Sequence, residues 1–156
     1  MQKVLEAAEA EVGYQAIGSA SKYFSELFPM RRSMPWCVPF IEWIFQEAYG
    51  KDKALEMLCL QKGGFIWSPQ SLLTFFKHKN KWHRKDADVG WLIFIRTNNE
   101  WTNHVELIIE VTENEITSIS GNCDGKVQKN IYQRDDIRIS GYGEIIYETE
   151  DTGCIE

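Results

Sequence analysis

The chain has 156 residues, is 44% apolar and carries a net charge of −6 with a pI near 5.2. This is an ordinary composition for one globular domain, and no apolar run approaches the roughly 18 residues that span a membrane. The acidic balance argues against nucleic acid as a partner, because phosphate binding requires clustered lysine and arginine. The N-terminus carries acids where a signal peptide needs an apolar run.

Four helices are predicted, all in the first half of the chain. A face of apolar residues spaced as in a helix begins at Val4, and Gly13 follows as a stop. Ser68 has the character of an N-cap with Pro69 at the first helical position. The predicted helices cover residues 2–12, 37–48, 53–60 and 68–77.

Strands are predicted from Gly90 onward. In the segment that begins at His104, apolar residues alternate with His104, Glu106 and Glu110, which is typical of a half-buried strand. The predicted strands cover residues 91–95, 104–111, 115–120, 127–132 and 137–147. Helices followed by an antiparallel sheet indicate an α+β fold. We expect one domain over residues 1–156, with a helical half to about residue 88, a β half over 89–147 and an acidic, frayed tail over 148–156.

The cysteines form no C-x-x-C pair and no zinc pattern with the three histidines. We interpret Cys37, Cys59, Cys123 and Cys154 as reduced thiols, with one disulfide left open, and expect neither a metal nor a cofactor. The basic stretch over residues 77–85 is interpreted as a solvated helix end and loop, and an anionic-ligand patch is the alternative.

One set of residues suits cysteine nucleophile chemistry. Cys37 begins a predicted helix, where unpaired N–H groups and the helix dipole favour a thiolate. His104 begins a strand at a sheet edge and is the candidate general base. Asn122, with Ser120 as a second candidate, follows on the next strand, where its amide oxygen could accept the Nδ1–H hydrogen bond and fix the imidazole tautomer. Taken alone, each residue also has a purely structural interpretation. Cys37 could be a packed thiol, His104 a surface or capping residue, and Asn122 part of a turn.

Several blocks resemble, in order, those of the CHAP domain, a cysteine, histidine-dependent amidohydrolase/peptidase in the NlpC-type group of papain-like peptidases. The blocks are P-W-C-V-P-F-I-E-W (35–43), G-W-L-I-F-I (90–95), N-H-V-E-L-I-I-E-V (103–111), I-S-G-N (119–122) and S-G-Y-G (140–143). The resemblance covers residues 4 to 145 and implies a papain-like fold, with helices packed on a C-terminal antiparallel sheet or partly open barrel.

The resemblance further implies cleavage of peptidoglycan, at a peptide bond of the stem or cross-bridge or at the muramoyl-alanine amide. Carried over by position, Cys37 is the nucleophile, His104 the base and Asn122 the third, polar member, while the Cys37 N–H would help to stabilise the oxyanion. Groove positions are expected for Trp36, Tyr23 and Trp67, with packing as the alternative for each.

The chain departs from the family pattern at several positions. Ser120 stands where many CHAP domains have glutamate two residues before the asparagine, and the usual H-V-G is here H-V-E, which ends at Glu106. Family members that bind calcium carry an acidic loop before the cysteine. Here the stretch over residues 28–35 has no acid, so no calcium site is expected.

Two rival functions stay open beside the peptidoglycan hydrolase. The same residues could cleave or deamidate a protein, as an effector would, or the fold could serve as a non-catalytic wall-binding module. Because no signal peptide and no wall-binding domain is visible, we expect cytoplasmic synthesis and action on the wall after release or delivery, as for a phage or prophage lysin. The oligomeric state is not predicted.

Overall fold

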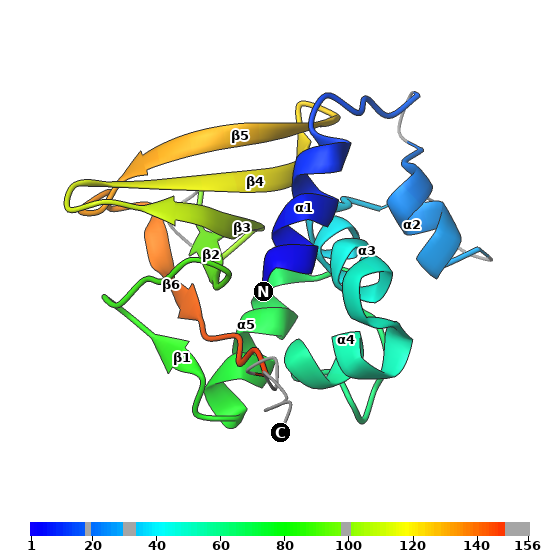
Figure 1. Ribbon diagram of the computed structural model, residues 1–156, viewed down its shortest axis with the longest axis horizontal. Helices are drawn as coiled ribbons and strands as arrows, with labels where there is room; N and C mark the ends of the chain where they lie inside the picture. Colours follow the sequence, from blue (N-terminus) through cyan, green and yellow to red (C-terminus); the bar gives the residue numbers. More distant parts are fainter. Residues whose placement is uncertain (18–19, 30–33, 98–100, 149–156) are drawn as a thin grey trace, which may run out of the picture.

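The computed structural model describes residues 1–17, 20–29, 34–97 and 101–148. These residues form five helices and a six-stranded sheet (Figure 1). The helices are α1 (Gln2–Glu11), α2 (Lys22–Leu27), α3 (Cys37–Tyr49), α4 (Lys51–Met57) and α5 (Pro69–His78). The strands are β1 (Trp82–His83), β2 (Leu92–Ile95), β3 (His104–Val111), β4 (Glu115–Cys123), β5 (Lys126–Gln133) and β6 (Ile139–Gly143).

The predicted α+β fold is confirmed, with the helices before the sheet along the chain. The sheet is open, in the order β1-β6-β2-β3-β4-β5, and its strands pair antiparallel throughout. Strands β2 to β5 form a meander, whereas β6 returns to the other side of β2. No helix among the described residues is long and apolar enough to cross a membrane.

Local signals account for most of the helices. The predicted cap of α5 is confirmed, since the Ser68 hydroxyl accepts the Ser71 N–H and Pro69 opens the helix. The sequence analysis missed α2 and β1. Helix α2 has six residues, too few to show a periodic apolar face, and is capped by Ser21, whose hydroxyl accepts the Phe24 N–H. Strand β1 has two residues and exists only by pairing with β6.

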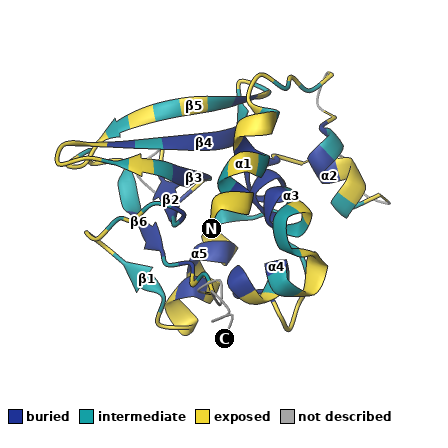
Figure 2. Cartoon of the chain, in the orientation of Figure 1, coloured by how far each residue is buried: buried dark blue, intermediate teal, exposed yellow. Residues whose placement is uncertain are grey.

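Helix α3 is the centre of the fold. It lies against the sheet at β3 and β4 and is surrounded on its other sides by α1, α2 and α4 (Figure 1). Its first nine residues are buried apart from the partly buried Trp43, and the burial map shows the same in dark blue along α3 and β4 (Figure 2). The N-terminus of α3 is therefore held on several sides, and whatever residue stands there is fixed in position.

The contact between α3 and β4 requires a glycine. A Cβ atom on Gly121 would lie 2.5 Å from Phe40 Cβ and 2.9 Å from the Trp36 ring, closer than packed carbon atoms approach. Phe40 Cβ is attached directly to the helix backbone, so the helix itself would have to shift. Gly121 thus sets how closely the first turn of α3 approaches the end of β4.

A buried carboxyl also lies on α3. Glu42 is fully buried, and its Oε1 accepts the Ile66 N–H at 2.7 Å. Its Oε2 has no hydrogen-bond partner among the described residues. Burial raises the pKa of Glu42 well above its usual range, an effect that the Ile66 hydrogen bond opposes and the nearby Cys37 increases. In its neutral form, the Glu42 side chain therefore links α3 to the segment that precedes α5.

Gly121→Ala is expected to destabilise the protein by about 1–3 kcal/mol, because the new methyl group overlaps Phe40. Thermal unfolding would show a lower Tm. Gly63→Ala is the matched control, since a Cβ there meets nothing within 4 Å. Equal melting temperatures for the Gly121 variant and the native chain would contradict the packing described.

Glu42→Gln is expected to flatten the pH dependence of stability. Because the folded-state pKa of Glu42 is raised, the folded state retains a proton that the unfolded state releases, so stability is lost as the pH rises above 4.5 toward the folded value. Glutamine keeps an acceptor for Ile66 and does not titrate. Chemical denaturation between pH 5 and pH 9 measures the slope, and the exposed Glu47→Gln on the same helix should leave it unchanged.

Candidate active site

Cys37 is the first residue of α3 and is only 2% exposed. The residue before it, Trp36, is the N-cap, and its carbonyl accepts the Phe40 N–H at 2.9 Å. The Cys37 N–H therefore belongs to the group of first-turn donors that have no partner within the helix. The helix start predicted from sequence is confirmed, and it places the sulfur at the positive end of a 13-residue helix.

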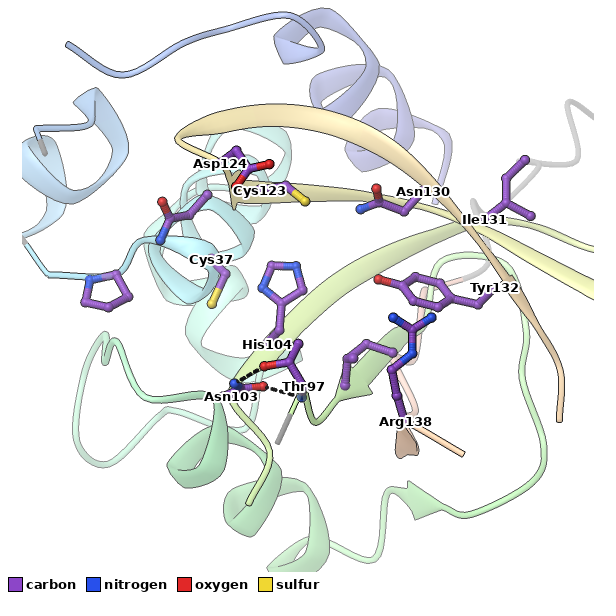
Figure 3. Close-up of a pocket in the computed structure, with 13 residues that line it drawn as sticks. Cys37, Thr97, Asn103, His104, Cys123, Asp124, Asn130, Ile131, Tyr132 and Arg138 are labelled. Carbon is purple, nitrogen blue, oxygen red and sulfur yellow. Dashed lines mark hydrogen bonds between the residues drawn. The ribbon is translucent and has the colours of Figure 1, made fainter. Parts of the chain in front are cut away.

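His104 is the first residue of β3, as predicted, and pairs with Ile95 of β2. Figure 3 shows its ring beside the sulfur of Cys37, and the interaction with Cys37 contributes to a raised pKa of the imidazole. The other side of the ring faces Glu106, whose Oε1 lies 3.1 Å from Nε2. This ion pair is the only polar contact of Nε2 among the described residues. Nδ1 is then the ring nitrogen available to the thiol.

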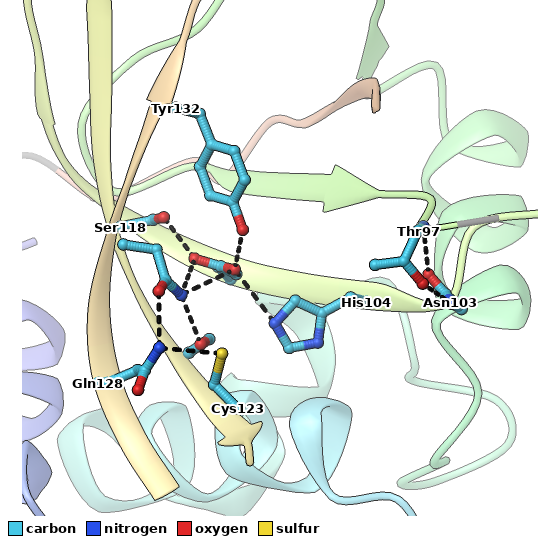
Figure 4. Close-up of polar contacts among 10 residues, drawn as sticks. Thr97, Asn103, His104, Ser118, Cys123, Gln128 and Tyr132 are labelled. Carbon is cyan, nitrogen blue, oxygen red and sulfur yellow. Dashed lines mark hydrogen bonds and ion pairs between the residues drawn. The ribbon is translucent and has the colours of Figure 1, made fainter. Parts of the chain in front are cut away.

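Glu106 is the carboxylate of the site, and it is fully buried. Besides its contact with His104, it accepts hydrogen bonds from three side chains on the next two strands (Figure 4). Ser118 on β4 donates its hydroxyl, Tyr132 on β5 donates its phenol at 2.6 Å, and Asn130 donates from Nδ2 at 3.1 and 3.2 Å. A charge removed from water requires such partners.

These contacts determine the ionisation of Glu106. Burial alone would raise its pKa, but the hydrogen bond and charge of His104, with the hydroxyls of Ser118 and Tyr132, lower the pKa below its usual range. For His104, by contrast, burial alone would lower the pKa. Its contacts with Cys37 and Glu106 outweigh burial and raise that pKa to about 10. At neutral pH the site therefore holds a buried imidazolium between the sulfur and a carboxylate.

A second layer of polar side chains surrounds the carboxylate. Asn130 donates to Ser120 as well as to Glu106, and its amide oxygen accepts from Gln128. The Gln128 amide also donates to Cys123 at 3.0 Å. Ser120, one of the orienting candidates from the sequence, is fully buried and reaches the site only through Asn130. It supports the carboxylate and does not contact the imidazole.

Asn122 lies beside Cys37 and His104, because all three line one pocket. Its backbone has a φ of +60°, and the pairing of β4 with β5 shifts register between Ser120 and Cys123. This bulge breaks the strand alternation on which the sequence analysis relied to place Ser120 and Asn122 on one face. The Asn122 amide makes no hydrogen bond to the described residues, so the expected contact with His104 is absent. Glu106, which the sequence analysis assigned to the polar side of a strand, contacts the ring instead, at Nε2 and not at Nδ1.

The pocket is an open cleft of about 540 Å³ (Figure 3). Near the thiol its rim is shaped by Thr97 and Asn103, where the Asn103 amide oxygen accepts the Thr97 N–H at 3.0 Å. Farther from the thiol it is lined by Asn130 and Tyr132 of β5 and by Arg138, the residue before β6 (Figure 3). The sulfur and the imidazole thus stand in an open cleft that is also lined by polar side chains.

The aromatic residues expected at the groove do not line this cleft. Tyr23 is fully buried and Trp36 is 2% exposed. Their rings pack against each other with centroids 5.4 Å apart, and the Tyr23 phenol donates to Glu11 at 2.6 Å. Trp67 is partly buried against the aromatic rings of α2 and the segment after it. All three aromatic side chains therefore pack against other aromatic rings, which was the alternative stated for them.

In the part of the chain that the structure describes, no group of three or more His, Cys, Asp or Glu side chains is arranged so that it could hold a metal ion. Residues 30–33 of the acid-free stretch before the cysteine lie outside the described residues. Cys37, Cys59 and Cys123 are free thiols. Cys154 and the acidic tail after residue 148 also lie outside the described part.

The sequence matches the model of a known protein family. Residues 30–122, more than half of the chain, match the family model of the CHAP domain. This segment begins before Cys37, contains His104 and ends at Asn122. Among curated proteins, no sequence matches this chain.

Solved structures share the fold at low sequence identity. One is Ly7917, with a TM-score of 0.57 and 15% identity over 92% of this chain and 61% of that chain. A second Ly7917 structure, with "the hydrolyzing product of MDP", gives 0.55 and 15% over 90% and 60%. PlyC gives 0.52 and 13% over 92% and 36%. The chain thus spans less than two thirds of the length of each of these proteins.

Glu106→Gln is expected to lower the pKa of His104 from about 10 by at least about one unit, because glutamine fills the same space without the charge that stabilises the imidazolium. Histidine ring titration by NMR measures this directly. Glu110→Gln, an exposed glutamate on the same strand, is the matched control. An unchanged His104 titration in the Glu106 variant would show that the carboxylate does not govern the imidazole.

Proposed function

The chain belongs to the CHAP domain family, and we propose from this that it is a peptidoglycan hydrolase that uses Cys37 as its nucleophile. The observation that carries the proposal is the imidazole of His104, held between the Cys37 sulfur and the buried Glu106 carboxylate. Cysteine peptidases require a thiolate, an imidazole that carries a proton, and a polar group that orients the ring.

The proposed reaction begins with the Cys37 sulfur attacking the carbonyl carbon of an amide bond. The carbonyl oxygen becomes an oxyanion, for which the first-turn N–H of Cys37 is a donor at the helix start. His104 then transfers its proton to the leaving nitrogen as the C–N bond breaks, which leaves a thioester and a free amine. In the second half, His104 takes a proton from water, the hydroxide attacks the thioester, and the carboxylic acid and the cysteine are released.

Glu106 acts as a positioning residue in this scheme. Its contact with Nε2 orients the ring so that Nδ1 faces the sulfur, and its charge stabilises the imidazolium in both half-reactions. Asn122 was assigned from sequence as the third, polar member. With Glu106 at the ring, we propose that Asn122 serves the substrate, because its amide lies in the cleft without a protein hydrogen bond.

The substrate is proposed to be the stem or cross-bridge peptide, or the amide that joins muramic acid to the stem. Ly7917 has been crystallised with "the hydrolyzing product of MDP", and the shared fold is consistent with a related substrate here. An open cleft of about 540 Å³ admits an extended peptide. We further propose a role as a phage-type lysin that acts on the wall after release or delivery.

A cysteine protease or deamidase that acts on a protein is the second candidate, because the same sulfur and imidazole would serve it. A wall-binding module without catalysis is the third. The three differ in measurable properties. A protein-directed enzyme would leave sacculi intact while Cys37 reacts rapidly with iodoacetamide at neutral pH, whereas a binding module would alkylate no faster than an ordinary thiol.

Incubation with purified sacculi tests the proposal, with products identified by mass spectrometry. Soluble fragments are expected, and Cys37→Ala should abolish their release. Cys59→Ala is the matched control, because it removes a free thiol outside the cleft. A new amine on a stem or bridge residue identifies a peptidase, and release of the whole stem from muramic acid identifies an amidase. Full activity of the Cys37 variant would refute the mechanism.

A further inference from the structure

A second pocket, of about 310 Å³, lies outside the catalytic cleft. The two pockets share no lining residue, yet they are lined by neighbours in the chain: Ile95 and Thr97 line the cleft, while Arg96 between them lines the second pocket. The second pocket is lined by Gln70, Leu73, Lys77, Trp82, Arg84, Arg96, Trp101, Thr102 and Ser140.

The charge of this pocket is positive, in contrast to the net charge of −6 for the whole chain. Lys77, Arg84 and Arg96 line it, and no aspartate or glutamate among the described residues does. No ion pair joins these three side chains to an acid in the described part of the chain. Cations of one sign gathered in a concave site attract anions and raise their local concentration.

The floor of the pocket is polar and ordered by the protein itself. The hydroxyls of Thr102 and Ser140 lie 2.7 Å apart. Gln70 accepts the Thr102 N–H through Oε1 at 3.1 Å, which leaves its amide N–H groups as donors toward a ligand. Arg96 is anchored through its main chain, whose N–H donates to the Arg138 carbonyl at 2.9 Å.

One wall of the pocket is the indole ring of Trp82, which is held in place by its neighbours. The Trp82 ring packs edge-on against Phe94 with centroids 5.3 Å apart, and Gly141 lies so close that an added Cβ would be 2.5 Å from the ring. The Lys77 amine lies 5.5 Å from the centre of the same ring. A rigid aromatic surface beside cations binds a flat, partly apolar ring that carries negative charge, without a loss of side-chain freedom.

We propose that this pocket is an exosite for an anionic saccharide, a sugar ring that bears a phosphate or a carboxylate. Arginine pairs with both groups through parallel N–H donors, and the hydroxyl and amide groups of the floor suit sugar hydroxyls. A nucleic acid would need a longer basic surface than this enclosed pocket in an acidic chain. The proposal rests on the proposed function, because the polymer held here would be the wall polymer that the enzyme is proposed to cut.

Binding by an inactive protein tests the exosite separately from hydrolysis. In a Cys37→Ala background, the double substitution Arg84→Gln and Arg96→Gln should weaken pelleting with purified sacculi at least about tenfold, because two charge-assisted contacts are lost. The matched control, Lys3→Gln with Lys51→Gln, removes the same charge from exposed positions outside both pockets. Unchanged melting temperatures show that both double variants remain folded.

Sacculi stripped of phosphodiester-linked polymers by acid distinguish the two sources of negative charge. If the effect of the arginine substitutions disappears on stripped sacculi, the ligand is a phosphate; if it persists, the ligand is a carboxylate of the peptidoglycan. Equal losses in the control, or no arginine dependence on either preparation, would overturn the proposal. Tighter arginine-dependent binding of a single-stranded oligonucleotide than of sacculi would overturn it as well.

Discussion

The candidate active site depends on one buried charge, the carboxylate of Glu106. Removal of a carboxylate from water costs several kcal/mol, so it remains ionised only where the protein replaces the lost solvent. Three neighbouring side chains, Ser118, Asn130 and Tyr132, donate hydrogen bonds to it, and the imidazolium of His104 supplies the opposite charge. The raised pKa of His104 follows from this arrangement together with the sulfur on its other side. If the carboxylate were neutral, burial would favour a neutral imidazole.

The sheet topology explains how so many partners reach one carboxylate. Strands β3, β4 and β5 are consecutive neighbours in the meander, and Ser118 pairs with Asn130 across β4 and β5. Side chains on one face of three adjacent strands therefore converge next to the first residues of β3 (Figure 4). Helix α3 supplies the sulfur from outside the sheet, at a distance that the contact of Gly121 with Phe40 determines. The site thus joins two layers, with the proton carrier on the sheet and the nucleophile on the helix.

The residues with local signatures could be predicted from sequence, and those that depend on packing could not. Cys37 and His104 each stand at the start of an element, where apolar periodicity begins, so their positions followed from the pattern. Glu106 alternates with apolar residues and resembles a solvent-facing glutamate, but the polar side of β3 is itself covered where Asn130 and Tyr132 of β5 meet it. Asn122 was placed by extending the alternation of β4, which fails at the bulge.

The position of the orienting carboxylate has consequences for the cleft. Many CHAP domains have glutamate where this chain has Ser120, on the strand opposite the histidine. Here the carboxylate stands on the same strand as His104, two residues along, so the spacing within β3 fixes the ring more directly than pairing between strands would. Ser120 contributes through Asn130 as a second-layer support. At the end of β4 the backbone is left-handed at Asn122, and this residue lines the same cleft as Cys37 and His104.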